Sequence, residues 1–131
     1  MHCSVKYIAL LALFFCGGVT AHQWTPTYPQ LRPSYIQGIH TTDMRLYNTR
    51  GDVDYYRIQV LDEDFKPLKF AIDSGQSNTV NVRFRKFKTV SIYVPSEQSS
   101  RVVYICSKSL ILRSNQTGSV LSSRICSKVN R

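Results

Sequence analysis

Apolar and polar residues alternate in short runs through most of the chain. Tyr56, Ile58 and Val60, for example, are separated by Arg57 and Gln59. Successive side chains of a strand point to opposite faces of a sheet, so this alternation predicts strands that bury one face. A short strand is also expected at residues 68–72. Similar alternation occurs in three further runs, at residues 44–47, at Val80, Val82 and Phe84, and at Val90, Ile92 and Val94.

Turn-forming residues separate these runs. They lie at 48–52, 62–67 and 73–78, and a polar loop follows at 95–100. Turns about every eight to twelve residues, without an apolar stripe of helical period, predict an all-β antiparallel sandwich of about seven strands over residues 36–131. Residues 22–35 contain three prolines and three aromatic residues, which favours an extended arm or an edge strand docked on the domain.

The first 21 residues have the composition of a secretory signal. Lys6 precedes an apolar run at 7–16, and small residues lead up to Ala21, after which cleavage is expected. The run is about ten residues long, too short for a helix that spans a bilayer of roughly 30 Å. An uncleaved membrane anchor and a lipid-modified Cys16 are the alternatives. The signal predicts an exported protein, periplasmic or secreted, whose mature part does not span a membrane.

Cleavage after Ala21 leaves two of the four cysteines, Cys106 and Cys126, each within an Ile-Cys-Ser-Lys tetrapeptide. An even pair of cysteines in an exported chain is typical of a disulfide. If two facing antiparallel strands carry them, the turn falls at residues 115–117, where Asn, Gln and Thr lie in a segment of turn-forming residues. A metal site would need four ligands, and a redox pair is more often CxxC, so a disulfide is favoured.

The register of this hairpin assigns its two faces. Odd-numbered residues, including Ile105, Ile125 and Val129, form a core face, and even-numbered residues, including both cysteines, form an outer, basic face. Lys108 opposes Arg124 on that outer face. Like charges in facing positions favour water or a bound anion.

Positive charge is concentrated in the second half of the chain. The formal net charge is +9, and from Arg83 onward there are ten Lys or Arg residues but a single acidic residue, Glu97. Such a surface suits lipopolysaccharide, nucleic acid or an acidic protein, and the alternative is a basic face that is only solvated. The stretch RFRKFK at 83–88 fits nucleic-acid binding by stacking, but its period of two favours a strand with Phe84 inward and Arg83 and Arg85 outward.

Motifs of catalysis and cofactor binding are absent from the sequence, which has no GxSxG, no HExxH and no phosphate-binding glycine loop. We therefore expect no enzyme, no cofactor, no metal and no small-molecule substrate. Asp62, Glu63 and Asp64 offer too few oxygen ligands for a tight calcium loop and are interpreted as a turn. His22, the residue after the expected cleavage site, is a minor candidate for metal binding at the amino terminus.

Three stretches carry a family resemblance: MRLYNTRGDVDYYRIQVLDED from Met44, PSEQSSRVVYICSK from Pro95 and SVLSSRICSK from Ser119. They resemble the amino-terminal immunoglobulin-like domain of periplasmic pilus chaperones. The resemblance implies an immunoglobulin-like sandwich and, as in some members, a disulfide between the last two strands. It also implies strand addition at the last strand, with Val120 and Leu121 offered to the partner and Lys128 as the anchoring cation. The chain is also similar to small exported proteins of marine tailed phages.

The sequence thus predicts an exported, non-enzymatic interaction or structural module of the cell envelope or of a phage particle, with a protein partner. Binding is expected through the basic face of the disulfide-linked hairpin. The alternatives are a periplasmic assembly chaperone that acts by strand addition, and a secreted enzyme inhibitor or small enzyme. The candidate partner-binding residues are Lys108, Val120, Leu121, Arg124, Lys128, Arg83 and Arg85.

Overall fold

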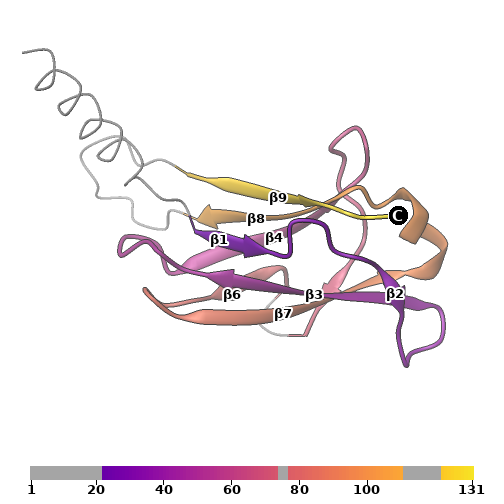
Figure 1. The fold of residues 1–131 in the computed structure, drawn as a ribbon, viewed down its shortest axis with the longest axis horizontal. Coiled ribbons are helices and arrows are strands. Elements are labelled where there is room, and N and C mark those ends of the chain that lie inside the picture. Colours follow the sequence, from indigo (N-terminus) through magenta and orange to yellow (C-terminus); the bar gives the residue numbers. More distant parts are fainter. Residues whose placement is uncertain (1–21, 74–76, 111–121) are drawn as a thin grey trace, which may run out of the picture.

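Two antiparallel sheets pack face to face in a computed structural model, which describes residues 22–73, 77–110 and 122–131 (Figure 1). Sheet A has the order β1 (Gln23–Thr25), β3 (Ile39–Tyr47), β7 (Phe87–Pro95), β5 (Ala71–Ile72), with β2 (Arg32–Pro33) also paired to β3. Sheet B has the order β6 (Thr79–Asn81), β4 (Tyr55–Leu61), β8 (Tyr104–Leu110), β9 (Arg124–Lys128). The 3-10 helix η1 (Ser96–Arg101) connects β7 to β8.

The strand order is that of an immunoglobulin-like sandwich. Immunoglobulin domains place strands A, B, E and D in one sheet and C, F and G in the other. Here β1, β3, β7 and β5 form the first set and β4, β8 and β9 the second, with β6 added beside β4. The predicted fold class is confirmed. The described residues contain nine strands rather than about seven, and the two additional strands, β1 and β2, are short edge pieces within residues 22–35, the segment expected to be an extended arm or an edge strand.

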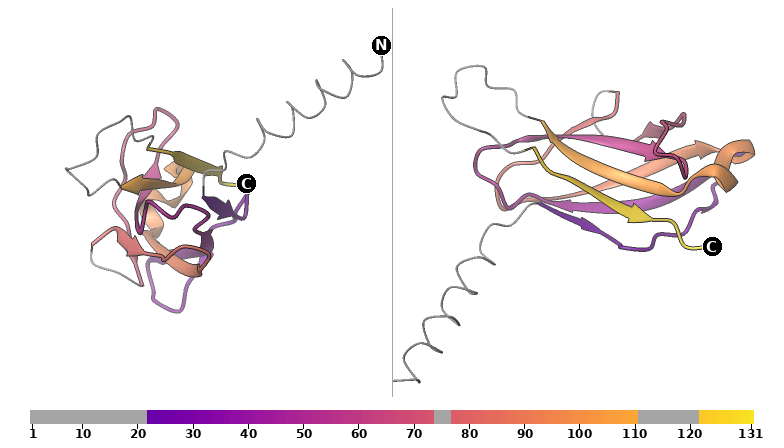
Figure 2. Two further views of the ribbon diagram at one scale, coloured as in Figure 1. Left: turned by 90° about the vertical axis from the view of Figure 1, so that its left-hand side faces the viewer. Right: turned by 90° about the horizontal axis from the view of Figure 1, so that it is seen from above.

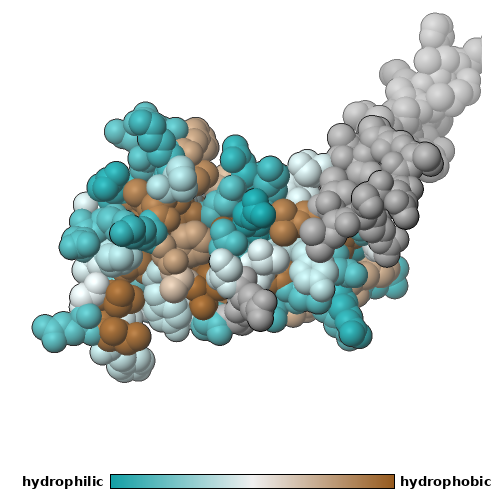
Figure 3. Space-filling view, turned by 180° about the vertical axis from the view of Figure 1, so that it is seen from behind, coloured by the Kyte–Doolittle hydropathy of each residue, from teal (hydrophilic) through white to brown (hydrophobic). Residues whose placement is uncertain are grey.

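The core lies between the sheets and is filled by the alternating residues. Tyr56, Ile58 and Val60 of β4 are buried, as are Met44 and Leu46 of β3 and the three apolar residues of β7. On the edge away from β1 and β9, apolar surface is visible between hydrophilic margins (Figure 3). The β4–β6 connection contributes partly buried apolar residues that pack on the core, namely Leu68, Phe70 and Ile72.

Phe84 departs from the predicted alternation. Val80 and Val82 are buried as expected, but Phe84 is 45% exposed. The reason is that β6 ends at Asn81 and the chain then turns, with Arg85 in a left-handed conformation at φ 62°. The inward orientation predicted for Phe84 is therefore wrong. The strand expected at 68–72 is also shorter, since only Ala71–Ile72 pairs with β7.

The amino-terminal segment contacts both sheets. Trp24 of β1 is buried, and its indole N–H donates a hydrogen bond of 2.9 Å to the Ile105 carbonyl in the opposite sheet. Further along, the backbone N–H groups of Lys128 and Asn130 donate to the Thr27 and Pro29 carbonyls at 3.1 and 2.8 Å. The first and last segments of the sandwich thus lie side by side and close this edge (Figure 2).

The carboxy-terminal hairpin has the predicted register. Cys106 pairs with Cys126 and forms a disulfide with a Cα–Cα distance of 4.0 Å, and Lys108 pairs with Arg124. Ser107 and Ile105 face the core, as predicted for odd-numbered residues. Cys106 belongs to the outer side by parity, yet it is fully buried, because β8 lies between β4 and β9. The expected turn at 115–117, together with Ile111, lies outside the described residues.

The expected signal, residues 1–21, also lies outside the described residues. Among the residues that are described, no helix is long and apolar enough to cross a membrane.

Replacing Cys106 and Cys126 together by alanine is expected to lower the free energy of unfolding by about 3 kcal/mol, since the disulfide closes a loop with a separation of 20 residues. Urea unfolding of the oxidised wild type and the double variant measures this difference. Reductant should destabilise the wild type and leave the double variant unchanged, and the oxidised wild type should weigh about 2 Da less than the reduced chain. Alkylation of both thiols in unfolded protein without reductant would contradict the disulfide.

Candidate binding face of the disulfide-linked hairpin

Three cations form a row across the outer face of sheet B. Arg57 of β4 pairs in register with Lys108 of β8, which in turn pairs with Arg124 of β9. Neighbouring strands are about 4.8 Å apart, so these side chains emerge next to one another. Arg57 and Arg124 are exposed and Lys108 is partly buried. We call these three residues the basic row.

The basic row carries uncompensated charge. Within the ranges that the structure describes, the ion pairs are Arg32–Asp43 and Arg50–Asp52, and neither includes a member of the row. Like charges that face each other across a strand pair destabilise a sheet, by up to about 1 kcal/mol for each pair. A bound anion would reverse this cost.

An aromatic pair borders the basic row. Phe65 projects from the turn after β4 and stacks on Tyr104 of β8, with the ring centroids 4.5 Å apart and the planes at 8°. The guanidinium carbon of Arg124 lies 5.9 Å from the Phe65 ring centroid. The Asp62 carboxylate shapes the turn by accepting hydrogen bonds of 2.9 Å from the backbone N–H groups of Asp64 and Lys66. The row and the aromatic pair therefore form one continuous surface, which we call the hairpin face.

The remaining predicted site residues are distributed differently. Lys128 lies on the hairpin face, four residues from Arg124 along β9 and opposite Tyr104. Arg83 and Arg85 lie in the turn between β6 and β7, beyond Asn81, where the pairing of β6 with β4 ends, so they do not belong to this face. Val120 and Leu121 lie outside the described residues. Arg57 was not among the site residues predicted from the sequence, because its pairing with Lys108 joins strands that are distant along the chain.

A buried polar cluster lies on the other side of β8. The His22 Nε2 atom is 2.7 Å from Ser107 Oγ, and Nδ1 is 3.3 Å from Ser123 Oγ. Burial, with a smaller contribution from the positive charge of Arg50, lowers the pKa of His22 from 6.5 to about 4, although a hydrogen bond with the Ser107 backbone opposes the shift. A serine beside a histidine is also found in hydrolytic sites. Here His22 is 2% exposed and Ser107 is fully buried, so a substrate has no access and the cluster is part of the core.

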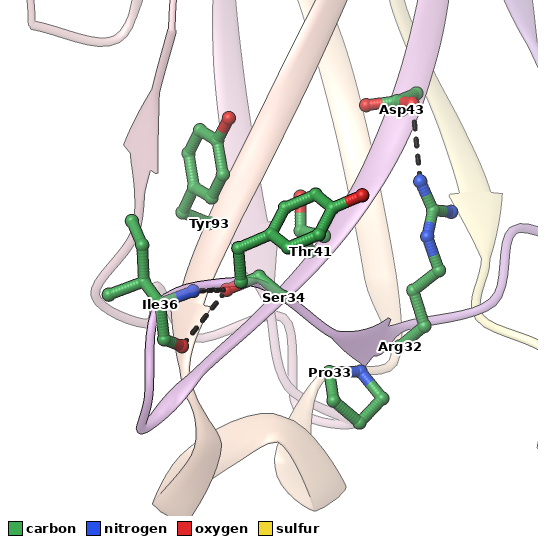
Figure 4. A pocket seen from close by; sticks show the side chains of 8 residues that line it. Arg32, Pro33, Ser34, Ile36, Thr41, Asp43 and Tyr93 are labelled. Carbon is green, nitrogen blue, oxygen red and sulfur yellow. Dashed lines mark hydrogen bonds and ion pairs between the residues drawn. The ribbon is translucent and has the colours of Figure 1, made fainter.

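A groove of about 600 Å³ opens on the outer face of sheet A. Tyr93 and Ile36 lie on one side of it, and Arg32 and Asp43 lie on the other (Figure 4). Its polar groups already pair with one another, since Arg32 contacts Asp43 at 3.3 Å and Ser91 donates to Asp43 at 2.7 Å. In contrast to the basic row, the charges of this groove are compensated.

In the described ranges, no group of three or more His, Cys, Asp or Glu side chains is placed so that it could hold a metal ion. In comparisons with known proteins, no family model matches the chain and no curated protein matches it.

The disulfide fits a protein of an oxidising, extracytoplasmic environment. The function must therefore be inferred from the chemistry of the surfaces described above.

Burial of neutral His22 should make stability depend on pH. Its pKa is about 4 in the folded state and 6.5 in the unfolded chain, so only the unfolded state gains a proton between these values. The free energy of unfolding should stay constant above pH 6.5 and fall by about 1–2 kcal/mol between pH 7.5 and pH 5.

Urea unfolding at both pH values tests this dependence, with His22→Gln as the comparison because glutamine hydrogen-bonds without titrating. The variant should be less stable at pH 7.5 but lose less stability on acidification than the wild type. An equal loss in the two proteins would mean that His22 does not carry the pH dependence.

Proposed function

We propose that this protein is an exported, non-enzymatic binding module that engages an acidic segment of a protein partner through the hairpin face. The observation that carries the proposal is the basic row, in which Arg57, Lys108 and Arg124 are held side by side and form no ion pair with any acid among the residues that the structure describes. Like-charge rows lower stability, so an arrangement of this kind favours a ligand that supplies negative charge. The aromatic pair beside it adds a flat apolar surface of the type enriched in protein interfaces.

The charge pattern of the face favours a protein over an extended anionic surface. Glu63 and Lys128 line the same shallow cleft next to Tyr104, so one end of the hairpin face carries an acidic residue. A membrane or a nucleic acid presents one sign of charge everywhere and would be repelled at that end. A protein segment can present acidic residues to the basic row and a neutral or basic residue to Glu63, which gives the orientation of binding as well as its strength.

The expected location follows from the signal-like residues 1–21 and from the disulfide. Both fit a periplasmic or secreted protein, and the partner would be a component of the cell envelope or of a phage particle.

Strand addition to β9 is the alternative function, and the backbone hydrogen bonds of this strand weigh against it. The N–H groups of Lys128 and Asn130 already donate to Thr27 and Pro29. A partner strand at this end of β9 would have to displace that segment, whereas binding to the hairpin face leaves every backbone hydrogen bond in place.

Charge reversal at Lys108 and Arg124 tests the proposal. Capture from the native envelope or particle fraction should recover an acidic partner with the wild type, and the double Lys108→Glu, Arg124→Glu variant should recover at least about tenfold less. Lys128→Glu should have a smaller effect because Lys128 lies beside Glu63. Binding should weaken as salt rises, since the charges of the face are largely exposed.

The matched control is Arg83→Glu, Arg85→Glu, which changes the net charge equally but lies outside the hairpin face. Recovery of the partner from a detergent-solubilised fraction, which contains no bilayer, should be unaffected in this control. If both double variants lose the partner to the same extent, binding follows net charge alone and the hairpin face is not the site.

A further inference from the structure

Residues 83–88, RFRKFK, form a second basic surface, separate from the hairpin face. The stretch contains four cations and two phenylalanines, and we call it the basic-aromatic turn. Phe84 is 45% exposed and Phe87 is 56% exposed, in contrast to the inward orientation that alternation predicted for Phe84. Two large apolar rings in solvent beside uncompensated cations need an explanation other than packing.

Neighbouring residues hold these rings in their exposed positions. The guanidinium carbon of Arg85 lies 4.9 Å from the Phe84 ring centroid, and that of Arg45 lies 4.0 Å from the Phe87 centroid. Tyr47 also stacks on Phe87, with the centroids 4.4 Å apart. Each exposed ring is therefore accompanied by a cation.

The backbone of the turn is also fixed. The Arg85 N–H donates to the Asn48 carbonyl at 2.8 Å, and the Lys86 N–H donates to the Arg83 carbonyl at 3.0 Å. In the described part of the chain, no ion pair includes a cation of the basic-aromatic turn or Arg45. The turn thus presents preformed positive charge.

The turn lies at the end of the sandwich where the chain enters it. Gln23, the first residue of β1, pairs with Tyr47, the last residue of β3, and Tyr47 pairs with Phe87, the first residue of β7. Residues 1–21, with the apolar run at 7–16, are therefore joined to the sandwich at the end that carries the exposed rings and cations.

We propose that this end docks on the surface of an anionic lipid bilayer. Lipid phosphates would contact Arg83, Arg85 and their basic neighbours, and the edges of Phe84 and Phe87 would enter the interface between headgroups and acyl chains. The apolar run at 7–16 is joined to this same end of the sandwich. During export the run would bring this end to a membrane, and without cleavage after Ala21 it would hold the end there. The proposal is independent of the hairpin face.

Single-stranded nucleic acid is the other ligand that combines phosphates with flat apolar groups, and the geometry favours it less. A base would have to stack on an exposed ring face. The Phe87 ring is already contacted by Tyr47 and by the Arg45 guanidinium, so a base would have to displace one of them. Insertion of a ring edge into lipid requires no such displacement.

Vesicle co-sedimentation tests the proposal, with the intact mass of the purified protein recorded so that the presence or loss of residues 1–21 is known. Vesicles of phosphatidylglycerol and phosphatidylcholine should bind the wild type, and pure phosphatidylcholine should bind it far less. Replacing Arg83 and Arg85 by serine should lower partitioning about thirtyfold, since each basic residue near an anionic surface contributes roughly fivefold. Replacing Phe84 and Phe87 by serine should lower it about tenfold.

The matched control is Arg57→Ser, Lys108→Ser on the hairpin face, which removes the same charge and should bind the anionic vesicles within about twofold of the wild type. All substituted side chains are exposed or partly exposed, and a cooperative urea unfolding transition would verify that each variant folds. Equal losses in the control and the turn variants would overturn the proposal. It would also fail if vesicles did not distinguish anionic from neutral lipid, or if a single-stranded oligonucleotide bound while vesicles did not.

Discussion

The pairing of Cys106 with Cys126 fixes the register of the last two strands, and the rest of the structure depends on that register. A shift by one residue would turn every side chain of β9 to the opposite face. Ser127 would leave the core, where it is buried, and the cations of the outer face would replace it. The disulfide therefore separates a neutral, serine-containing core face from a basic outer face, and the hairpin face exists only because this separation holds.

Asn48 organises the end of the sandwich that carries the basic-aromatic turn. Its side-chain amide donates hydrogen bonds of 2.6 and 2.7 Å to the carbonyls of Val53 and Val82, and its Oδ1 accepts from the Tyr56 hydroxyl and the Arg50 N–H. One buried asparagine thus joins the end of β3 to the start of β4 and to the segment after β6. The position of the exposed phenylalanines is in this way coupled to the core through Tyr56.

Local patterns predicted the fold, and long-range pairing determined the site. Alternation identified the buried residues of β4 and β7, and the spacing of the two cysteines predicted the hairpin register, because both depend on neighbours in sequence. Arg57 reached the basic row only through its pairing with β8, which no local pattern encodes. Phe84 was assigned inward because alternation does not reveal where a strand ends, and Phe65 was overlooked because its segment reads only as a turn.

The hydrogen bonds between residues 27–29 and the end of β9 constrain the order in which parts of this protein can fold. The hydrogen-bond partners of Thr27 and Pro29 are Lys128 and Asn130, which lie 101 residues later in the chain, so these bonds can form only after the intervening chain has been synthesised. The hydrogen bond of the Trp24 indole likewise requires the Ile105 carbonyl, which lies 81 residues further along the chain. This edge of the sandwich can therefore close only after β9 has been synthesised. Under the proposed export, late closure is an advantage, because the chain can pass a translocation channel before this edge of the sandwich forms.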